Sequence, residues 1–398
     1  MPICFKKTIC EVNLCAFVRI CFLSHTPFNF SLSMKKLSYY ILASLLIVSC
    51  NNASAVKNII AVTEDSVEVK PDTVTSTLLF VGDLMQHSGQ FKAALACGGG
   101  KKYNYEETFR LVKPMISAAT IAIGNFETTL GGEPYSGYPC FSAPDDYLYA
   151  LKETGFDVLT TANNHCCDRR AKGLVRTLDV LQKADIPCCG TYADSLDRSK
   201  RYPLIFDAGG IKVCLLTYTY GTNGITVQQP TIVNIIDKDQ MAKDIKKAKS
   251  MKPDVIIASL HWGIENVTTE NAEQRELAKW LIEQGVDHII GSHPHMIQPS
   301  TYIKDAKGVE HYVVYSLGNY VSNMQLPDNK IGLTVTLKLQ KITAKGKSIT
   351  KLVDVAEEKT YCSLPSVNNI RNYRVIPAST PDSILCPTER TARLGSLK

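Results

Sequence analysis

The chain repeats one arrangement along much of its length: a short run of aliphatic or β-branched residues, then a polar cluster, then a stretch with the apolar spacing of a helix. Alternation of this kind predicts an α/β fold in which helices cover the faces of a sheet. In such folds the loops at the carboxyl ends of the strands meet at one rim, where ligands bind. The expected strands are residues 78–81, 120–123, 158–161, 213–217, 255–260, 288–290, 312–315 and 333–339.

The polar clusters that follow these strands are rich in His, Asn and acidic residues. Of the eight histidines in the chain, five lie in them. Imidazole, carboxylate and amide oxygen ligands together suit zinc, manganese or iron better than calcium, so the set predicts a divalent-metal site. Ligands from several strands favour two ions, which together clamp a reacting oxygen and activate a water. The clusters contain Asp83, His87, Asn125, Glu127, Asn163, Asn164, His165, His261, Trp262, His293, His295 and Asn319.

Each cluster also has a purely structural interpretation. Asn163 and Asn164 suit turns and helix caps. A buried histidine such as His261 is often satisfied by a backbone carbonyl, and a lone acid such as Glu127 is usually exposed. The metal interpretation therefore depends on the joint occurrence of these residues at successive strand ends.

An export signal is predicted near the start of the chain. Met34, Lys35 and Lys36 precede an apolar run over residues 39–48, and Cys50 follows a small residue. This order resembles a bacterial lipoprotein signal, after which Cys50 is acylated and anchors the protein to the cell envelope. The apolar run is short for a bilayer span, so an uncleaved membrane anchor is the alternative. Residues 1–33 are interpreted as upstream sequence from an early start codon, 34–50 as the signal and 51–76 as a tether.

The charge of the chain gives no reason to expect a nucleic-acid partner. The formal net charge is +6, and residues 1–50 hold five Lys or Arg against one acid. The remainder is close to neutral and lacks the basic stripe on which sequence-independent phosphate binding depends. Nine cysteines follow Cys50, and their redox state stays open because an exported location permits disulfides without requiring them.

The strand-end clusters resemble those of the CapA family of poly-γ-glutamate capsule-synthesis proteins. The matching segments span about residues 77–325, and their joint order is specific although each one alone is weak. They are Gly82-Asp83-Leu84-Met85, Asn125-Phe126-Glu127, Ala162-Asn163-Asn164-His165, His261-Trp262-Gly263, Ser292-His293-Pro294-His295 and Tyr315-Ser316-Leu317-Gly318-Asn319.

The resemblance implies a four-layered α/β/β/α sandwich related to the calcineurin-like metallophosphatases. The expected domain covers residues 77–340, and residues 341–398 are expected to form an extension that packs on the sheet edge and then becomes disordered. Carried over by position, the resemblance implies six metal ligands, of which Glu127 is the candidate bridge. These ligands are Asp83, Glu127, Asn164, His261, His293 and His295.

The remaining cluster residues receive secondary roles in this interpretation. His165 follows the ligand-type asparagine and is the candidate general acid. Met85 stands where related phosphoesterases have a histidine ligand, so His87 is the candidate replacement, provided that the loop brings it onto the same face as Asp83. We expect Asn125, Asn163, Trp262 and Asn319 to shape the site.

Three functions remain open from the sequence. The leading hypothesis is a divalent-metal hydrolase that cuts a phosphoester or amide-type bond in an envelope or capsule polymer. The second is a non-catalytic accessory protein of a polymer synthesis or export complex, in which the metal only orders a binding surface. The third is transfer of the polymer end to a cell-wall acceptor, which requires the same polarised carbonyl or phosphoryl group.

Overall fold

The computed structural model describes residues 71–365 and 372–397. The expected signal, Cys50 and nearly all of the expected tether lie outside these residues. Within the described part of the chain, no helix combines the length and the apolar character needed to cross a membrane.

The first of two large sheets has the strand order β16-β15-β14-β1-β2-β3-β4, and β13 also pairs with β1. Strands β1 to β4 and β13 run parallel, whereas β14, β15 and β16 form antiparallel ladders at one side. The strands are β1 (Asp72–Leu84), β2 (Ile121–Asn125), β3 (Val158–Thr160), β4 (Cys188–Cys189), β13 (Asn319–Val321), β14 (Ile331–Ala344), β15 (Lys347–Ser363) and β16 (Arg374–Pro377).

The second sheet has the order β11-β12-β10-β9-β7-β6, with four parallel central strands and an antiparallel strand at each edge. The strands β5 (Thr191–Tyr192) and β8 (Ile232–Val233) form a separate two-stranded antiparallel ribbon. The strands are β6 (Leu204–Ala208), β7 (Ile211–Thr219), β9 (Val255–His261), β10 (His288–Ser292), β11 (Ile297–Lys304) and β12 (Glu310–Leu317).

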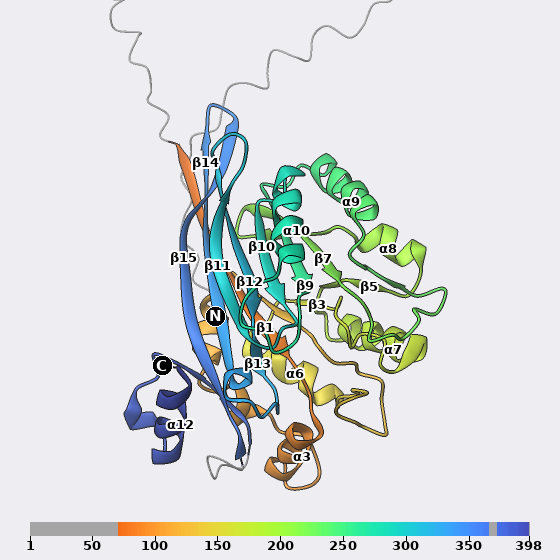
Figure 1. Cartoon of the computed structure of the whole chain (residues 1–398), viewed down its shortest axis with the longest axis vertical. Helices are drawn as coiled ribbons and strands as arrows, with labels where there is room; N and C mark the ends of the chain where they lie inside the picture. Colours follow the sequence, from red (N-terminus) through yellow and green to blue (C-terminus); the bar gives the residue numbers. More distant parts are fainter. Residues whose placement is uncertain (1–70, 366–371, 398) are drawn as a thin grey trace, which may run out of the picture. The chain divides into compact units, whose positions relative to one another are not determined.

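Helices cover the outer face of each sheet (Figure 1). On the first sheet these are α4 (Glu106–Phe109), α5 (Lys113–Ala118), α6 (Asp145–Thr154) and α7 (Arg170–Lys183), and on the second α9 (Lys238–Ser250) and α10 (Ala272–Glu283). The other helices are α3 (Ser88–Cys97), α8 (Ser195–Arg201) and α12 (Pro387–Leu397), with 3-10 turns at Pro327–Lys330 and Asp382–Ile384.

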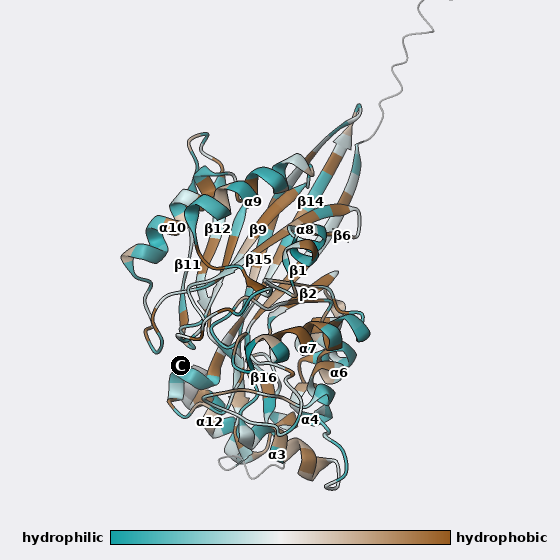
Figure 2. Ribbon diagram, turned by 90° about the vertical axis from the view of Figure 1, so that its right-hand side faces the viewer, coloured by the Kyte–Doolittle hydropathy of each residue, from teal (hydrophilic) through white to brown (hydrophobic). Residues whose placement is uncertain are grey.

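Strand β1 shows why the sheets pack face to face. Successive side chains of a strand point to opposite faces, and here both sets are apolar. Leu78 and Phe80 join the core that also contains the residues of β7, β9 and β10, while Leu79 and Val81 join the core under α6 and α7. Figure 2 shows apolar residues along the strands and mostly hydrophilic outer helices α9 and α10. The structure therefore confirms the expected α/β/β/α sandwich.

The domain extends beyond the expected limits at both ends. Strand β1 already pairs with β14 at Asp72, and β14 continues to Ala344, so residues 77 and 340 both fall inside strands. The expected extension contains the long strand β15, which continues the first sheet beyond β14. The expected disorder of the tail is wrong for residues 372–397, because a buried ion pair of 2.8 Å between Arg374 and Glu389 fastens α12 to β16.

Candidate metal centre

The carboxyl ends of the parallel strands of both sheets meet at one buried cluster of polar side chains. The first sheet contributes the ends of β1 and β2 and the turn after β3, and the second contributes the end of β9 and the turn after β10. None of these side chains is more than 3% exposed, which is unusual for charged and polar groups. The cluster contains Asp83, Glu127, Asn164, His261, His293 and His295.

Glu127 lies at the centre of this cluster. Its carboxylate belongs to two groups of potential ligands whose atoms lie within 4.8 Å of one another: one with His293 and His295, the other with Asp83 and His261. Oε1 of Glu127 is 3.7 Å from Nε2 of His295 and 3.8 Å from Nε2 of His261. A carboxylate shared by two groups is the arrangement that a bridging ligand requires.

Two asparagines that do not belong to these groups hold the carboxylates and imidazoles in place. Asn125 donates from Nδ2 to Oδ1 of Asp83 at 2.8 Å. Oδ1 of Asn319 lies 3.0 Å from Nδ1 of His295, which is also 3.1 Å from Oδ2 of Asp83. Partners of this kind fix the ring orientation of a histidine ligand. The structure thus gives Asn125 and Asn319 supporting positions around the cluster.

Several buried atoms of the cluster have no hydrogen-bond partner among the described residues. They include the two ligand-type atoms Oε1 of Glu127 and Nδ1 of His293. A buried polar atom left unpaired costs free energy, and each such atom in a native structure calls for an explanation. Carboxylate and imidazole donors suit zinc, manganese and iron. The residues present therefore fit a divalent metal, which would take up these free ligand atoms.

Burial sets the protonation of the cluster. It lowers the pKa of His261 well below its usual value and that of His293 to about 3, so both imidazoles are neutral, the form that binds a metal. Burial, together with the neighbouring Asp83, raises the pKa of Glu127. For His295 burial is again the largest single effect and lowers the pKa, but the hydrogen bond to Asp83, the charges of Asp83 and Glu265 and the hydrogen bond to Asn319 together outweigh burial and raise the pKa.

The turn after β10 holds its histidines in a strained backbone. His293 has φ 100° and His295 has φ 55°, in the left-handed region that residues with a Cβ rarely adopt. Such strain persists where surrounding structure enforces it, often at functional sites. Trp262 contributes to this constraint: its Nε1 donates to the Tyr315 carbonyl at 2.9 Å, which ties the loop after β9 to β12.

His165 lies beside the cluster, outside both ligand groups. Its Nδ1 is 2.8 Å from Oδ2 of Asp168, and both side chains are buried. Asn163 shapes this turn, since its Oδ1 accepts from the His165 N–H at 3.1 Å and its Nδ2 donates to the Phe126 carbonyl at 2.9 Å. The sequence interpretation missed Asp168, although its spacing of three residues from His165 was visible.

His87 does not join either ligand group. Asp83 lies in a strand and His87 has the extended backbone of a helix cap, so the helical spacing that would align them is absent. Its Nδ1 lies 3.3 Å from the Asn323 N–H, and its ring packs at 5.1 Å on the edge of Phe141. Burial lowers the pKa of His87 to about 4. The structure thus gives it a supporting position instead of the expected ligand position.

Tyr220 is a further residue that the sequence interpretation did not single out. It follows β7, and its ring centre lies 4.5 Å from that of His293 and 6.4 Å from that of His261. The side chain is 44% exposed, so it forms part of the rim through which a ligand would approach. Only its position directly after a strand end could have indicated this role.

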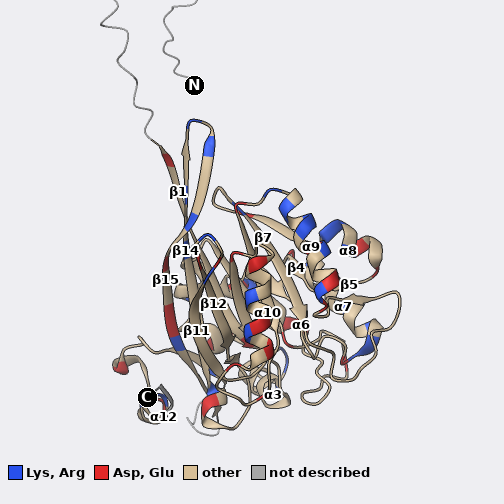
Figure 3. Ribbon diagram, turned by 45° about the horizontal axis from the view of Figure 1, so that its top comes forward, with Lys and Arg blue, Asp and Glu red and all other residues tan. Residues whose placement is uncertain are grey.

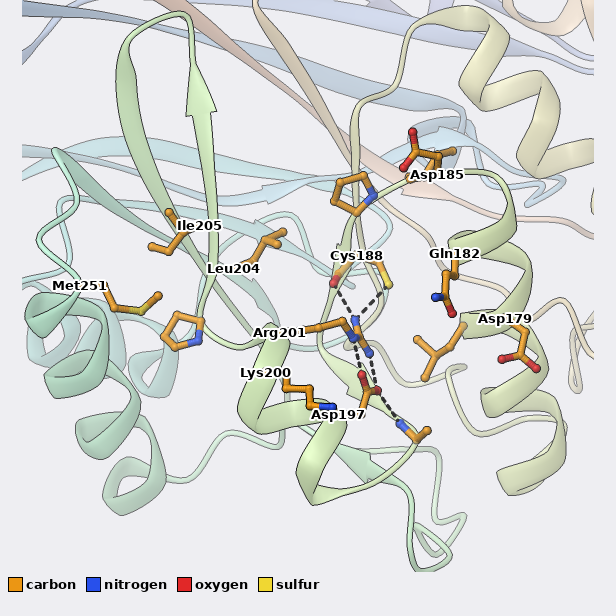
Figure 4. Close-up of a pocket in the computed structure, with 15 residues that line it drawn as sticks. Asp179, Gln182, Asp185, Cys188, Asp197, Lys200, Arg201, Leu204, Ile205 and Met251 are labelled. Carbon is orange, nitrogen blue, oxygen red and sulfur yellow. Dashed lines mark hydrogen bonds and ion pairs between the residues drawn. The ribbon is translucent and has the colours of Figure 1, made fainter.

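A separate cavity of about 540 Å³ is lined by residues of α7, α8 and β6. Figure 4 shows that Arg201 contacts Asp197 of the same helix, with Nε 2.5 Å from the carboxylate, and the Cys188 carbonyl. None of the predicted site residues lines this cavity. The guanidinium of Arg201 is thus occupied by internal partners, and we assign no function to the cavity.

Comparison with known proteins confirms the family that the strand-end motifs indicate. The model of the family described as bacterial capsule synthesis protein PGA_cap matches residues 77–324. The capsule biosynthesis protein CapA of Bacillus anthracis is 31% identical over 62% of this chain and 59% of its own length. The PGA biosynthesis protein CapA of Bacillus subtilis is 28% identical over 61% of this chain and 62% of its own length. The match thus spans about three fifths of each relative.

Proteins of known structure are less similar in sequence to this chain than the two CapA proteins are. The calcineurin-like phosphoesterase YfkN from Bacillus subtilis aligns with 82% of this chain and 100% of that chain, at 18% identity and a TM-score of 0.45. The sulfate thiohydrolase SoxB of Thermus thermophilus aligns with 81% of this chain and 59% of that chain, at 14% identity and a TM-score of 0.40. The family is established by the sequence match over residues 77–324, and this chain belongs to the bacterial capsule synthesis family PGA_cap.

Proposed function

We propose that the protein is a divalent-metal hydrolase that cuts a phosphoester or amide-type bond in a capsule or other envelope polymer. The observation that carries the proposal is the position of Glu127. Its Oε1 has no hydrogen-bond partner among the described residues and lies 3.8 Å from Nε2 of His261 and 3.7 Å from Nε2 of His295, inside a buried set of potential ligands. The names of the two relatives, both capsule or PGA biosynthesis proteins, supply the polymer class.

The proposed ligands fall into two sets that share Glu127. His293 and His295 serve one ion, and Asp83 and His261 serve the other. Asn164 lies beside the second set, with its Oδ1 3.0 Å from Nε2 of His261. Two bound ions would polarise a phosphoryl or carbonyl oxygen and activate a water for attack on it.

His165 is the proposed proton donor to the leaving group. The contact between its Nδ1 and Oδ2 of Asp168 fixes the tautomer, so that Nε2 remains to carry or release a proton. The Phe141 N–H donates to the same carboxylate oxygen at 2.7 Å, which holds Asp168 in turn. General acid catalysis of this kind contributes roughly a hundredfold to ten-thousandfold in rate.

We further propose that the protein is exported and anchored to the bacterial envelope through an acylated Cys50, and that it works beside the complex that makes or exports the polymer. Support comes from the order of charged, apolar and small residues before Cys50 and from the family itself. Replacement of Cys50 by alanine should release the protein from the membrane fraction and should abolish its labelling by a fatty-acid analogue.

The first test is metal content. We expect about one to two ions per chain by mass spectrometry, in line with a shared carboxylate, and the double variant His293→Ala/His295→Ala should lose them. The variant His293→Gln/His295→Gln preserves more side-chain volume in case alanine prevents folding. The matched control is His288→Gln/His311→Gln. These two histidines lie at the starts of β10 and β12, at the ends away from the metal cluster, so this variant should retain the metal.

The second test is turnover of a phosphodiester and of a γ-glutamyl anilide by the metal-loaded protein. Hydrolysis of either one that disappears in the His293/His295 variants would support the proposal. Full metal content in those variants would contradict the ligand assignment. A protein that binds metal but turns over neither substrate nor the purified polymer would instead be the accessory protein.

A further inference from the structure

The hairpin of β14 and β15 is strongly basic. Between residues 338 and 353 the chain has five lysines and no acidic residue. The turn lies at Lys345 and Gly346, both with positive φ, and Lys345, Lys347 and Lys351 are exposed. Figure 3 shows basic residues at the tip and along the strands of the hairpin, and an acidic residue at the start of the neighbouring strand β1. The lysines are Lys338, Lys341, Lys345, Lys347 and Lys351.

The two faces of this hairpin differ in what they contact. On the inner face Leu352 packs against the core between the sheets, and Lys341 forms a 2.8 Å ion pair with Asp254. On the outer face Ile342 pairs directly across the strands with Ile349, which is 62% exposed. Because side chains alternate along a strand, Lys347 and Lys351 share the face of Ile349.

The outer face therefore joins the exposed Ile349 and its half-buried partner Ile342 to flanking lysines. Lysines along an unpaired strand edge also discourage pairing between copies of a protein. Protection of the strand edge explains the lysines, but it does not explain why Ile349 is exposed between them. An apolar patch rimmed by lysines is instead the composition of segments that rest on the headgroup region of a membrane.

The position of the hairpin points to the same partner. Asp72, at the start of β1, pairs with Thr343 near the hairpin tip, so residues 1–70 join the domain beside the basic surface. Asp83 of the metal centre is at the other end of β1. At about 3.3 Å per residue, these two ends of the strand are roughly 35 Å apart.

We propose that the outer face of the β14–β15 hairpin, with Lys345, Lys347, Lys351 and Ile349, docks onto an anionic phospholipid surface. The lysines would meet lipid phosphates, and the isoleucine pair would enter the headgroup boundary. An acylated Cys50, as proposed above, would attach the protein to a membrane but would not fix the orientation of the domain. The hairpin supplies that orientation and holds the metal centre away from the membrane. The inference needs no catalytic activity and so stands apart from the proposed hydrolase function.

Vesicle binding tests this inference. All proteins are full-length and carry Cys50→Ala, so that acylation contributes nothing and the apolar run of residues 39–48 is common to every sample. We measure cosedimentation with phosphatidylcholine vesicles with and without phosphatidylglycerol. The reference protein should bind the anionic vesicles more tightly, and added salt should weaken that binding.

The triple variant Lys345→Gln/Lys347→Gln/Lys351→Gln should bind the anionic vesicles on the order of a hundredfold more weakly. The matched control is Lys243→Gln/Lys246→Gln/Lys249→Gln, which removes the same charge from exposed positions of α9 and should bind normally. Ile349→Ser should weaken binding without changing its salt dependence. Circular dichroism melting should show that all variants remain folded, because the replaced lysines are exposed.

Three outcomes would overturn the inference. Equal binding to neutral and anionic vesicles would remove the lipid headgroup as the partner. An equal loss in the α9 control would show that the attraction depends only on net charge. If soluble polyglutamate binds the hairpin lysines while vesicles do not, this surface belongs to an anionic polymer and not to a membrane.

Discussion

Buried atoms without hydrogen-bond partners define the centre at the scale of single residues. Oε1 of Glu127 and Nδ1 of His293 are potential ligand atoms without a hydrogen-bond partner among the described residues, whereas Asp83 and His295 beside them are held by Asn125 and Asn319. The sequence could supply these identities because each one directly follows a strand. It could not supply Asp168, since its contact with His165 depends on how the turn at residues 165–168 closes.

Asp168→Asn tests the proton-donor assignment. The amide keeps the shape but removes the negative charge that stabilises a protonated His165, so kcat should fall by about tenfold to a hundredfold. Metal content should not change, because Asp168 belongs to neither ligand group. Activity and metal content are measured on the same preparation. A loss of metal in this variant would show that Asp168 supports the ligands and not the proton donor.

At the scale of elements, the buried strands were predictable and the exposed ribbon was not. The predicted runs 78–81 and 255–260 lie within β1 and β9, where both faces are covered and the sequence is continuously apolar. The β14–β15 hairpin alternates Lys, Thr and Ile on a half-exposed surface, so its apolar content is low and its true length escaped prediction. Likewise, α12 is fastened by ion pairs of Glu389 with Arg374 and of Arg393 with Asp382, which no periodicity reveals.

The start of β10 carries a pH-dependent contribution to stability. Burial lowers the pKa of His288 to about 3, and the nearby His311 adds to this effect. Below the ordinary histidine pKa of about 6.5 the unfolded chain takes up a proton at this position, whereas the folded chain does not until about pH 3. The unfolded state then binds more protons, so stability falls as the pH falls below 6.5.

His288→Gln should remove this dependence. Between pH 7.5 and 4.5 the wild-type protein should lose roughly 2 kcal/mol more unfolding free energy than the variant. Urea unfolding at a series of pH values provides the measurement. Burial raises the pKa of Asp287, so this residue favours the folded state as the pH falls. Asp287 is present in both proteins, and its effect therefore cancels in the comparison. Parallel pH profiles for the two proteins would refute the prediction.

At the scale of the whole domain, the centre joins the two sheets. Asp83 and Asn164 come from the first sheet, and they contact His295 and His261 of the second at 3.1 and 3.0 Å. The layers could be predicted from the alternation of strands and helices in the sequence. The contacts between the two sheets at the centre could not. Whether a given loop of one sheet reaches a given loop of the other depends on how the two sheets pack, which is a property of the assembled core.

Metal removal should therefore weaken the whole domain. Ligands that bind only the folded state stabilise it by roughly 4 kcal/mol at a thousandfold excess over Kd. We expect a chelator to lower the Tm by about 5–10 °C for a domain of this size. The variant His293→Gln/His295→Gln should melt at the lower temperature with or without chelator. A Tm that does not respond to chelator in the wild-type protein would show that the metal does not join the sheets.

Strand β1 also determines how the domain responds to force. Residue 71 leads directly into a strand that is paired along nine positions with β14 and further with β2, and whose far end carries Asp83. A pull on the preceding chain acts along the strand axis, nearly perpendicular to its hydrogen bonds. Those bonds are then loaded together in shear instead of being opened one at a time. A pull on this chain would therefore reach the end of β1 that carries Asp83 only after these hydrogen bonds had broken together.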